Sequence, residues 1–114
     1  MKTPLISVVI VTRDRKKELL NCLDSIFKQS KKPEEVIVVD NGSKLKAKKF
    51  LGRKFSRIKV IRSKTNLGGA GGRNLGLFHS KGKFILFMDD DAVAGPHMLK
   101  ELLKVINKDP KVGI

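Results

Sequence analysis

Cysteine, tryptophan and tyrosine are the residues that this sequence lacks or nearly lacks. The single cysteine, Cys22, excludes an internal disulfide framework and a zinc site built from cysteines, and its helical pattern beside Leu23 favours a buried thiol. Tryptophan and tyrosine are absent and there are six phenylalanines, so few side chains can stack on single-stranded nucleic acid. No apolar run approaches about 18 residues, so we expect no membrane-spanning helix in this sequence.

Acidic residues are also scarce. The 25 lysines and arginines outnumber 11 aspartates and glutamates, which gives a formal net charge of +14. A length of 114 residues suits one domain, and with 40% apolar residues the chain can form a core, so the charge does not indicate disorder. Ten of the basic residues fall between Lys44 and Lys64, and no acidic residue lies among them.

Apolar runs and helical patterns alternate along the chain. Leu5–Val11 is a nearly continuous β-branched run, typical of a strand buried on both faces of a parallel sheet. Similar patterns predict strands at 36–39, 58–61 and 84–88, helices at 14–29, 44–54 and 96–106, and a further strand beginning at 111. A glycine-rich segment at 66–76 leads into a third helix that carries Leu75 and Phe78. The βαβαβαβα order predicts an α/β fold with a mostly parallel, Rossmann-like sheet flanked by helices.

Three groups of acidic residues lie at the ends of predicted strands, where such sheets bind ligands. Asp14 follows the first strand and can cap the next helix, Asp40 ends the second strand, and Asp89–Asp91 end the fourth. Three consecutive carboxylates repel one another, and nothing nearby in the sequence neutralises them. In an extended chain Asp89 and Asp91 point to one side and Asp90 to the other, so we predict Mn²⁺ or Mg²⁺ on Asp89 and Asp91. A solvated acidic turn is the alternative.

The glycine-rich segment reads Asn-Leu-Gly-Gly-Ala-Gly-Gly-Arg-Asn over residues 66–74. Four glycines in five positions let the backbone approach a ligand, a helix start there would favour phosphate, and Arg73 is suited to pair with it. The segment follows the third strand and lacks Gly-Lys-Ser/Thr, so it is neither a dinucleotide-binding fingerprint nor a Walker loop. A flexible turn with a surface arginine is the alternative.

Four segments together resemble the N-terminal half of a family 2 glycosyltransferase of the GT-A fold. They are residues 7–15 (Ser-Val-Val-Ile-Val-Thr-Arg-Asp-Arg), 36–43 (Val-Ile-Val-Val-Asp-Asn-Gly-Ser), 66–76 and 82–91. They occur in the family's order and spacing, and the resemblance extends from Ser7 to about Leu103. The glycine-rich segment followed by a triple aspartate is most similar to the rhamnosyltransferase and galactofuranosyltransferase branch.

The resemblance implies a binding site for a nucleoside diphosphate sugar. Asp89 and Asp91 match the Asp-x-Asp motif, which holds Mn²⁺ or Mg²⁺ on the donor diphosphate, and the metal stabilises the charge of the leaving group. Thr12 and Asp14 fall where the family lines the base pocket, and Asp40 where it places an acid on the base or ribose. The donor-binding residues implied in this way are Thr12, Asp14, Asp40, Asn41, Gly69, Arg73, Asn74, Asp89 and Asp90.

The resemblance implies that residues 1–114 are one donor-binding half that stops before the acceptor half. The family needs a second half for the acceptor and for a general base, and no acid after Asp91 fits that role, since Glu101 lies in a helical pattern and Asp109 precedes Pro110. We therefore expect the general base beyond Ile114 and little transfer by this chain alone. The expected acceptor is a polysaccharide, a lipid-linked sugar or a protein, and the expected location is cytoplasmic or at the inner face of the membrane. An uncovered sheet edge would favour a homodimer.

The basic residues between Lys44 and Lys64 leave a second class of function open. It is a non-catalytic α/β module that binds nucleotides or nucleic acid. No helix-turn-helix, zinc or RNA-binding motif accompanies these residues, so a solvated helix face is favoured over a nucleic-acid surface. Peripheral membrane contact stays open, because many members of the family use lipid-linked acceptors.

Overall fold

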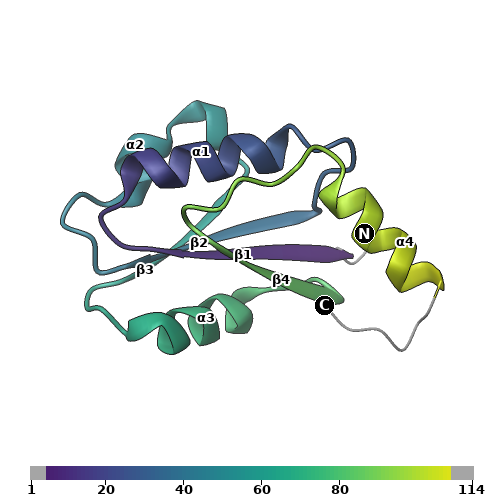
Figure 1. The fold of residues 1–114 in the computed structure, drawn as a ribbon. Coiled ribbons are helices and arrows are strands. Elements are labelled where there is room, and N and C mark those ends of the chain that lie inside the picture. Colours follow the sequence, from purple (N-terminus) through teal and green to yellow (C-terminus); the bar gives the residue numbers. More distant parts are fainter. Residues whose placement is uncertain (1–4, 109–114) are drawn as a thin grey trace.

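The computed structural model describes residues 5–108 (Figure 1). Strands and helices alternate along the chain as β1 (Ile6–Thr12), α1 (Lys16–Phe27), β2 (Glu35–Asn41), α2 (Ala47–Leu51), β3 (Lys59–Ser63), α3 (Gly68–His79), β4 (Phe84–Asp89) and α4 (Met98–Lys108). A 3₁₀ turn, η1 (Arg53–Phe55), follows α2. The four strands form one parallel sheet in the order β3-β2-β1-β4, so the predicted α/β fold is confirmed. The strand predicted to begin at residue 111 lies outside the described residues.

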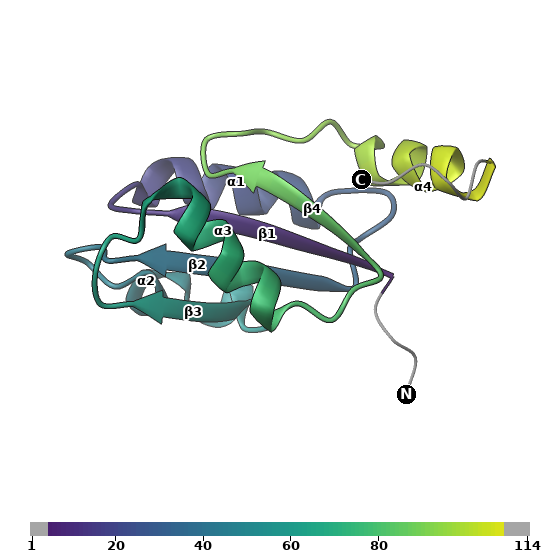
Figure 2. The ribbon, with the colours of Figure 1, turned by 90° about the horizontal axis from the view of Figure 1, so that it is seen from below.

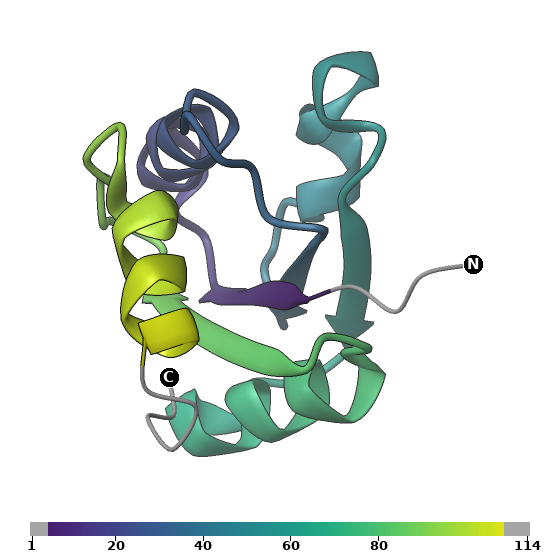
Figure 3. The same ribbon diagram turned by 90° about the vertical axis from the view of Figure 1, so that its right-hand side faces the viewer.

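Helices cover both faces of this sheet. α1 and α2 lie on one face and α3 on the other, whereas α4 lies at the end of the sheet where the strands begin (Figures 1 to 3). Alternate residues of β1 therefore meet different cores: Ile10 packs with Leu23 of α1, and Val9 packs with Ile37 on the α3 side. All four side chains are at most 1% exposed. Burial of both faces explains why the strand is apolar along its whole length.

The strand order switches between β1 and β4. The chain passes from β1 through β2 to β3 on one side, and then returns to the other side of β1 to form β4. The loop after β4 passes over the face that α1 covers, where the N–H of Ala94 donates a hydrogen bond to Oγ of Ser25, whereas α3, which leads into β4, lies on the other face. The register pairs Val11 with Asp89, so both strands end at the same level of the sheet.

Two glycines let α3 lie close to the sheet. A Cβ atom on Gly72 would lie 2.6 Å from Cγ1 of Val11, and a Cβ atom on Gly76 would overlap Cγ1 of Val9. Both glycines are buried, and larger residues at these positions would force the helix away. The glycine-rich segment expected to lead into this helix forms its first turns instead, because α3 already begins at Gly68.

The outer strands among the described residues are β3 and β4. The expected homodimer would use such an edge, and it stays a prediction. None of the helices within residues 5–108 combines the length and the apolar character needed to cross a membrane.

Candidate functional site

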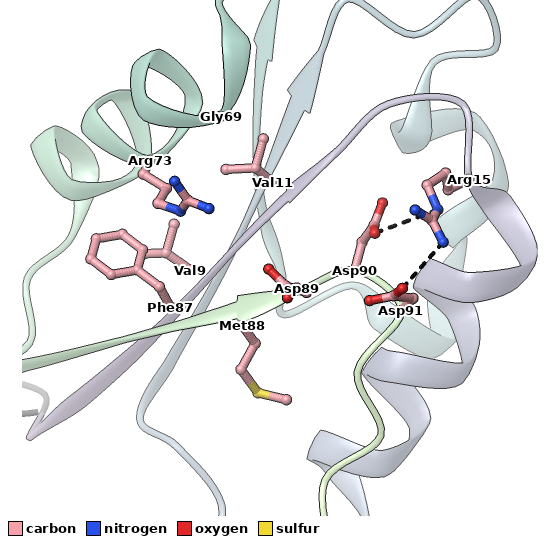
Figure 4. A pocket seen from close by; sticks show the side chains of 10 residues that line it. All are labelled: Val9, Val11, Arg15, Gly69, Arg73, Phe87, Met88, Asp89, Asp90 and Asp91. Carbon is pink, nitrogen blue, oxygen red and sulfur yellow. Dashed lines mark hydrogen bonds and ion pairs between the residues drawn. The ribbon is translucent and has the colours of Figure 1, made fainter.

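Two cavities lie at the carboxyl end of β1, one beside the end of β4 and the other beside the segment that follows β2. The larger, of about 300 Å³, lies between α3 and β4 (Figure 4). Its lining comprises Val9, Val11, Arg15, Gly69, Arg73, Phe87, Met88, Asp89, Asp90 and Asp91. The smaller, of about 140 Å³, is lined by Thr12, Asp14, Arg15, Lys16, Ser43, Leu45, Ala47 and Phe50. Arg15 belongs to both linings, so the two cavities adjoin.

The three aspartates after β4 differ in burial and in their partners. Asp89 and Asp91 are exposed, whereas Asp90 is only 8% exposed. The hydroxyl of Thr12 donates a hydrogen bond to Oδ2 of Asp90 at 2.9 Å, and Nε of Arg15 lies 3.6 Å from Oδ1 of the same carboxylate. Nη2 of Arg15 lies 3.4 Å from Oδ2 of Asp91. The charge of the triplet is thus offset by Arg15, which is distant in sequence and reaches the aspartates from the segment after β1 (Figure 4).

Burial also raises the pKa values of two groups at this site, Asp90 and Cys22. Burial raises the pKa of Asp90, and the hydrogen bond from Thr12 and the charge of Arg15 oppose this effect only in part. Burial and the charges of the three aspartates together raise the pKa of the Cys22 thiol to about 11. Cys22 is fully buried, and its sulfur lies 3.6 Å from the carbonyl oxygen of Asp89. The prediction of a buried thiol is confirmed, and the thiol is neutral at pH 7.

The donor set suits a cation that is shared with a ligand. Across residues 5–108, no three His, Cys, Asp or Glu side chains are grouped closely enough to hold a metal ion by themselves. Asp89 and Asp91 nevertheless present exposed carboxylates to the larger cavity. Mg²⁺ in particular is commonly bound by one or two carboxylates, with phosphate oxygens and water completing its shell. The residues present therefore fit an ion that arrives with a phosphate ligand.

Asp40 is held by protein groups on both carboxylate oxygens. Oδ1 accepts the backbone N–H of Ser43 at 3.1 Å, and Oδ2 accepts the N–H of Ala47 at 2.8 Å and Nη1 of Arg62 at 2.9 Å. Burial, at 1% exposure, raises the pKa of Asp40, but these hydrogen bonds outweigh it and lower the pKa below the ordinary value of 3.8. Asp40 thus positions the start of α2, and its expected contact with a base or ribose stays a prediction.

Asp14 lies on the rim of the smaller cavity. Its carboxylate accepts the N–H of Lys44 at 2.8 Å, and its own N–H donates to Oγ of Ser43 at 2.9 Å. Its φ of 53° turns the chain sharply after β1. The expectation that Asp14 caps the following helix is wrong, because α1 begins without a side-chain cap and this carboxylate is engaged by the loop after β2.

Asn41 and Asn74 do not line either cavity. Asn41 is 3% exposed, and its side chain accepts the N–H of Leu67 at 2.8 Å and donates to the carbonyl of Gly68 at 3.0 Å. It therefore fixes the start of α3, which brings Gly69 and Arg73 to the larger cavity. Asn74 is exposed on α3. Direct contact of either asparagine with a nucleotide stays a prediction.

Sequence reasoning missed Arg15, Ser43 and Phe50 as lining residues. The position of Arg15 in the sequence could have indicated its role. It lies three residues after β1, and a basic side chain there can face the acids at the end of β4. Nothing in the sequence indicated a site for Phe50, because it belongs with Leu45 and Leu51 to the apolar side of the predicted helix, which indicates only a core contact. Its place in the smaller cavity depends on how the loop at 42–46 turns.

Comparison with known proteins decides the family. Residues 7–114 match the family model described as glycosyl transferase family 2. The chain belongs to this family. An uncharacterized family relative, a glycosyltransferase of Haemophilus influenzae, is 35% identical over 109 residues, and galactofuranosyltransferase GlfT1 of Mycolicibacterium smegmatis is 34% identical over 92 residues. These alignments cover 96% and 78% of this chain.

The fold of this family 2 chain is also similar to that of S. aureus TarS. The crystal structure of TarS residues 1–349 in complex with UDP-GlcNAc superposes with a TM-score of 0.81 at 30% identity over 91% of this chain. The matched part is 37% of the H. influenzae protein, 30% of GlfT1 and 31% of the TarS chain. The chain thus spans about a third of the length of the proteins that it matches.

Proposed function

We propose that this chain is the donor-binding part of a glycosyltransferase and binds a nucleoside diphosphate sugar at the carboxyl ends of β1 and β4. The observation that carries the proposal is the larger cavity, where the exposed carboxylates of Asp89 and Asp91 face Arg73 of α3 (Figure 4). Carboxylates that bind a cation and an arginine that binds phosphate are complementary to a metal–diphosphate group. Solved complexes of the similar protein TarS with UDP and with UDP-GlcNAc support the same ligand class.

The smaller cavity is the proposed place of the nucleoside. Phe50, Leu45 and Ala47 supply apolar surface, and Asp14 and Ser43 supply polar groups at the same cavity. A nucleobase needs this combination, since its faces pack on apolar side chains and its edge forms hydrogen bonds. The diphosphate would then run past Arg15 into the larger cavity, and the sugar would lie near Phe87 and Arg73.

The proposed cation is Mg²⁺ or Mn²⁺ on Asp89 and Asp91. When bound, the cation stabilises negative charge on the departing nucleoside diphosphate. Arg73 adds a fixed positive charge from α3, and Asn41 holds the start of that helix in place. Buried Asp90 is tied to Thr12, so the turn that carries Asp91 is fixed to the end of β1.

Transfer itself needs groups that the described residues do not bring to this site. The acceptor hydroxyl would attack the anomeric carbon, the bond from that carbon to the diphosphate oxygen would break, and a carboxylate would take the hydroxyl proton. We propose that this carboxylate lies beyond Ile114 and that the acceptor is a polysaccharide, a lipid-linked sugar or a protein. The rhamnosyltransferase and galactofuranosyltransferase branch stays a prediction.

Thermal unfolding with and without metal tests the donor site. UDP-GlcNAc in excess is expected to raise the melting temperature of the chain by several degrees. A ligand at about 100 times its dissociation constant stabilises the folded state by roughly 2.7 kcal/mol. The rise should need Mn²⁺ or Mg²⁺, and Asp91→Asn should remove it. Glu101→Gln is the matched control, because it removes one acid from the exposed side of α4 and should keep the shift. UDP-, GDP- and dTDP-linked sugars compared in this way identify the base. A melting temperature that no nucleotide sugar changes would overturn the proposal.

The basic surface around α2 is the proposed contact with an anionic membrane. It consists of exposed lysines and arginines that form no ion pair within the described part of the chain, namely Lys44, Lys46, Lys48, Lys49, Arg53 and Arg57. Leu45, which is 49% exposed, lies among them. Each lysine or arginine at an anionic bilayer contributes about 1 kcal/mol. A membrane-bound donor site would suit a lipid-linked acceptor.

Sedimentation with lipid vesicles tests this surface. Vesicles that contain phosphatidylglycerol should pull down the chain at low salt, whereas vesicles of phosphatidylcholine alone should not. Neutralising four basic residues with K48Q, K49Q, R53Q and R57Q should weaken binding by more than about 100-fold. The control carries the same loss of charge elsewhere on the surface, with K17Q, K28Q, K81Q and K100Q. If duplex DNA binds through the same four residues and the lipid does not, the nucleic-acid module is supported instead.

A further inference from the structure

Arg15 lies between the two cavities and contacts the acids of the proposed metal site. It lies three residues after the end of β1 and immediately before α1, which begins at Lys16, and it contributes to both cavity linings. Its side chain is 46% exposed, so the guanidinium is open to a ligand. A donor with its nucleoside in one cavity and its sugar in the other would pass this group at the diphosphate.

The two acids that meet Arg15 are held differently. Asp90 is buried and fixed by the hydroxyl of Thr12, whereas the side chain of Asp91 is 55% exposed. Nε of Arg15 faces Asp90 and Nη2 faces Asp91 (Figure 4). The contact with Asp90 thus anchors one part of the guanidinium, and the more exposed contact with Asp91 is the one that a competing ion or phosphate can replace.

We infer that Arg15 couples the binding of the metal to that of the diphosphate. In the absence of a donor, its positive charge beside Asp91 opposes a divalent cation at the same carboxylate. When a diphosphate binds, the guanidinium pairs with phosphate oxygens, for which its geometry is suited, and Asp91 becomes available to the cation. Metal and nucleotide therefore bind more tightly together than either binds alone. This inference rests on the proposed function, since it concerns the same site.

Binding constants of the full chain for Mn²⁺ and UDP test this coupling. Free Mn²⁺ is measured by electron paramagnetic resonance, and UDP binding by calorimetry with and without Mn²⁺. Arg15→Gln is expected to bind Mn²⁺ alone about tenfold more tightly, and to bind UDP in saturating Mn²⁺ about tenfold more weakly. Arg15→Lys keeps the charge but not the forked geometry, so its Mn²⁺ constant should stay near that of the unmodified chain while its UDP constant falls between the two.

Arg13→Gln is the matched control. Arg13 is also exposed in the loop after β1, but it lines neither cavity, so the same loss of charge should change both constants by much less. If Arg15→Gln and Arg13→Gln changed the binding constants for Mn²⁺ and UDP equally, the change would come from net charge alone, and the inference would be overturned. Weaker Mn²⁺ binding by Arg15→Gln would also overturn it, since Arg15 would then only hold the aspartates in place. A chain that binds neither Mn²⁺ nor UDP would instead refute the proposed function, and the inference with it.

Discussion

Replacing Asp40 by alanine is expected to lower the free energy of unfolding by about 3 kcal/mol, because removal of one partner from a buried ion pair leaves its other groups unsatisfied. The variant loses the acceptor for two backbone N–H groups, of Ser43 and Ala47, and for the guanidinium of Arg62. Arg62 is 30% exposed, so its guanidinium can be solvated once Asp40 is removed. The loss of stability should therefore lie at the lower end of the range for broken buried ion pairs. Urea unfolding at pH 7 measures it.

The pH dependence of the free energy of unfolding of Asp40→Ala tests the direction of the pKa shift of Asp40. Because the pKa of Asp40 is lowered in the folded chain, its carboxylate stabilises the fold above the ordinary pKa of 3.8. That contribution is lost as the pH falls below 3.8 and through the folded value. The difference in stability between the unmodified chain and Asp40→Ala should therefore shrink in this acidic range.

Asp24→Ala provides a control with the same loss of charge. Asp24 pairs with Lys54 at 2.7 Å on the surface, where an ion pair contributes little. If the two variants unfold at the same urea concentration, the buried network around Asp40 does not stabilise the fold as argued.

Replacing Gly76 by alanine is expected to destabilise the chain by about 2 kcal/mol, which corresponds to a fall in melting temperature of roughly 10 °C. Alanine favours a helix by about 1 kcal/mol over glycine, but here its Cβ would overlap Cγ1 of Val9 and lie 3.1 Å from Cγ2 of Val39. Both valines are buried and β-branched, so they cannot rotate away at low cost. The helix would have to move outward, and Arg73 would move with it.

Two further variants separate this overlap from helix propensity. Gly69→Ala lies in the first turn of the same helix, where a Cβ would meet only the guanidinium of Arg73 at 3.5 Å, an ordinary contact. Its melting temperature should stay the same or rise. Val9→Ala combined with Gly76→Ala should recover part of the stability that the single substitution loses, because the smaller strand residue makes room. A stabilising Gly76→Ala would show that α3 does not need its close approach.

The arrangement of the sheet was predictable because its signals are local. The β-branched run at Leu5–Val11 indicates a strand buried on both faces, and the acids near the ends of the strands mark the edge of the sheet where the donor site is proposed. β1 and β4 lie within one residue of the predicted bounds, and β2 and β3 extend to Asn41 and Ser63, each two residues past the predicted end. The boundaries of α2 were less accurate, because a chain so rich in lysine shows the helical period only weakly between Lys44 and Lys54.

The partners of the acids were not predictable from spacing. Arg15 and Asp90 are 75 positions apart in sequence and meet only because β4 returns beside β1. Asp40 lies near the carboxyl end of β2, as a ligand-binding acid would, yet its oxygens are engaged by α2 and Arg62. Sequence pattern places a carboxylate at the rim of a sheet, but the neighbouring loops determine whether it faces a ligand or the protein.

The central strand acts as the common support of both sides of the site. Val9 and Val11 determine how closely α3 approaches the sheet. Thr12, at the end of the same strand, fixes the turn after β4 by its hydrogen bond to Asp90. A bulkier residue in the middle of β1 would therefore widen the distance between the arginine of α3 and the carboxylates of β4 without touching either. Exchange of paired small and large residues on β1 and α3 is therefore expected to change the size of the proposed donor cavity, which Val9 and Val11 also line.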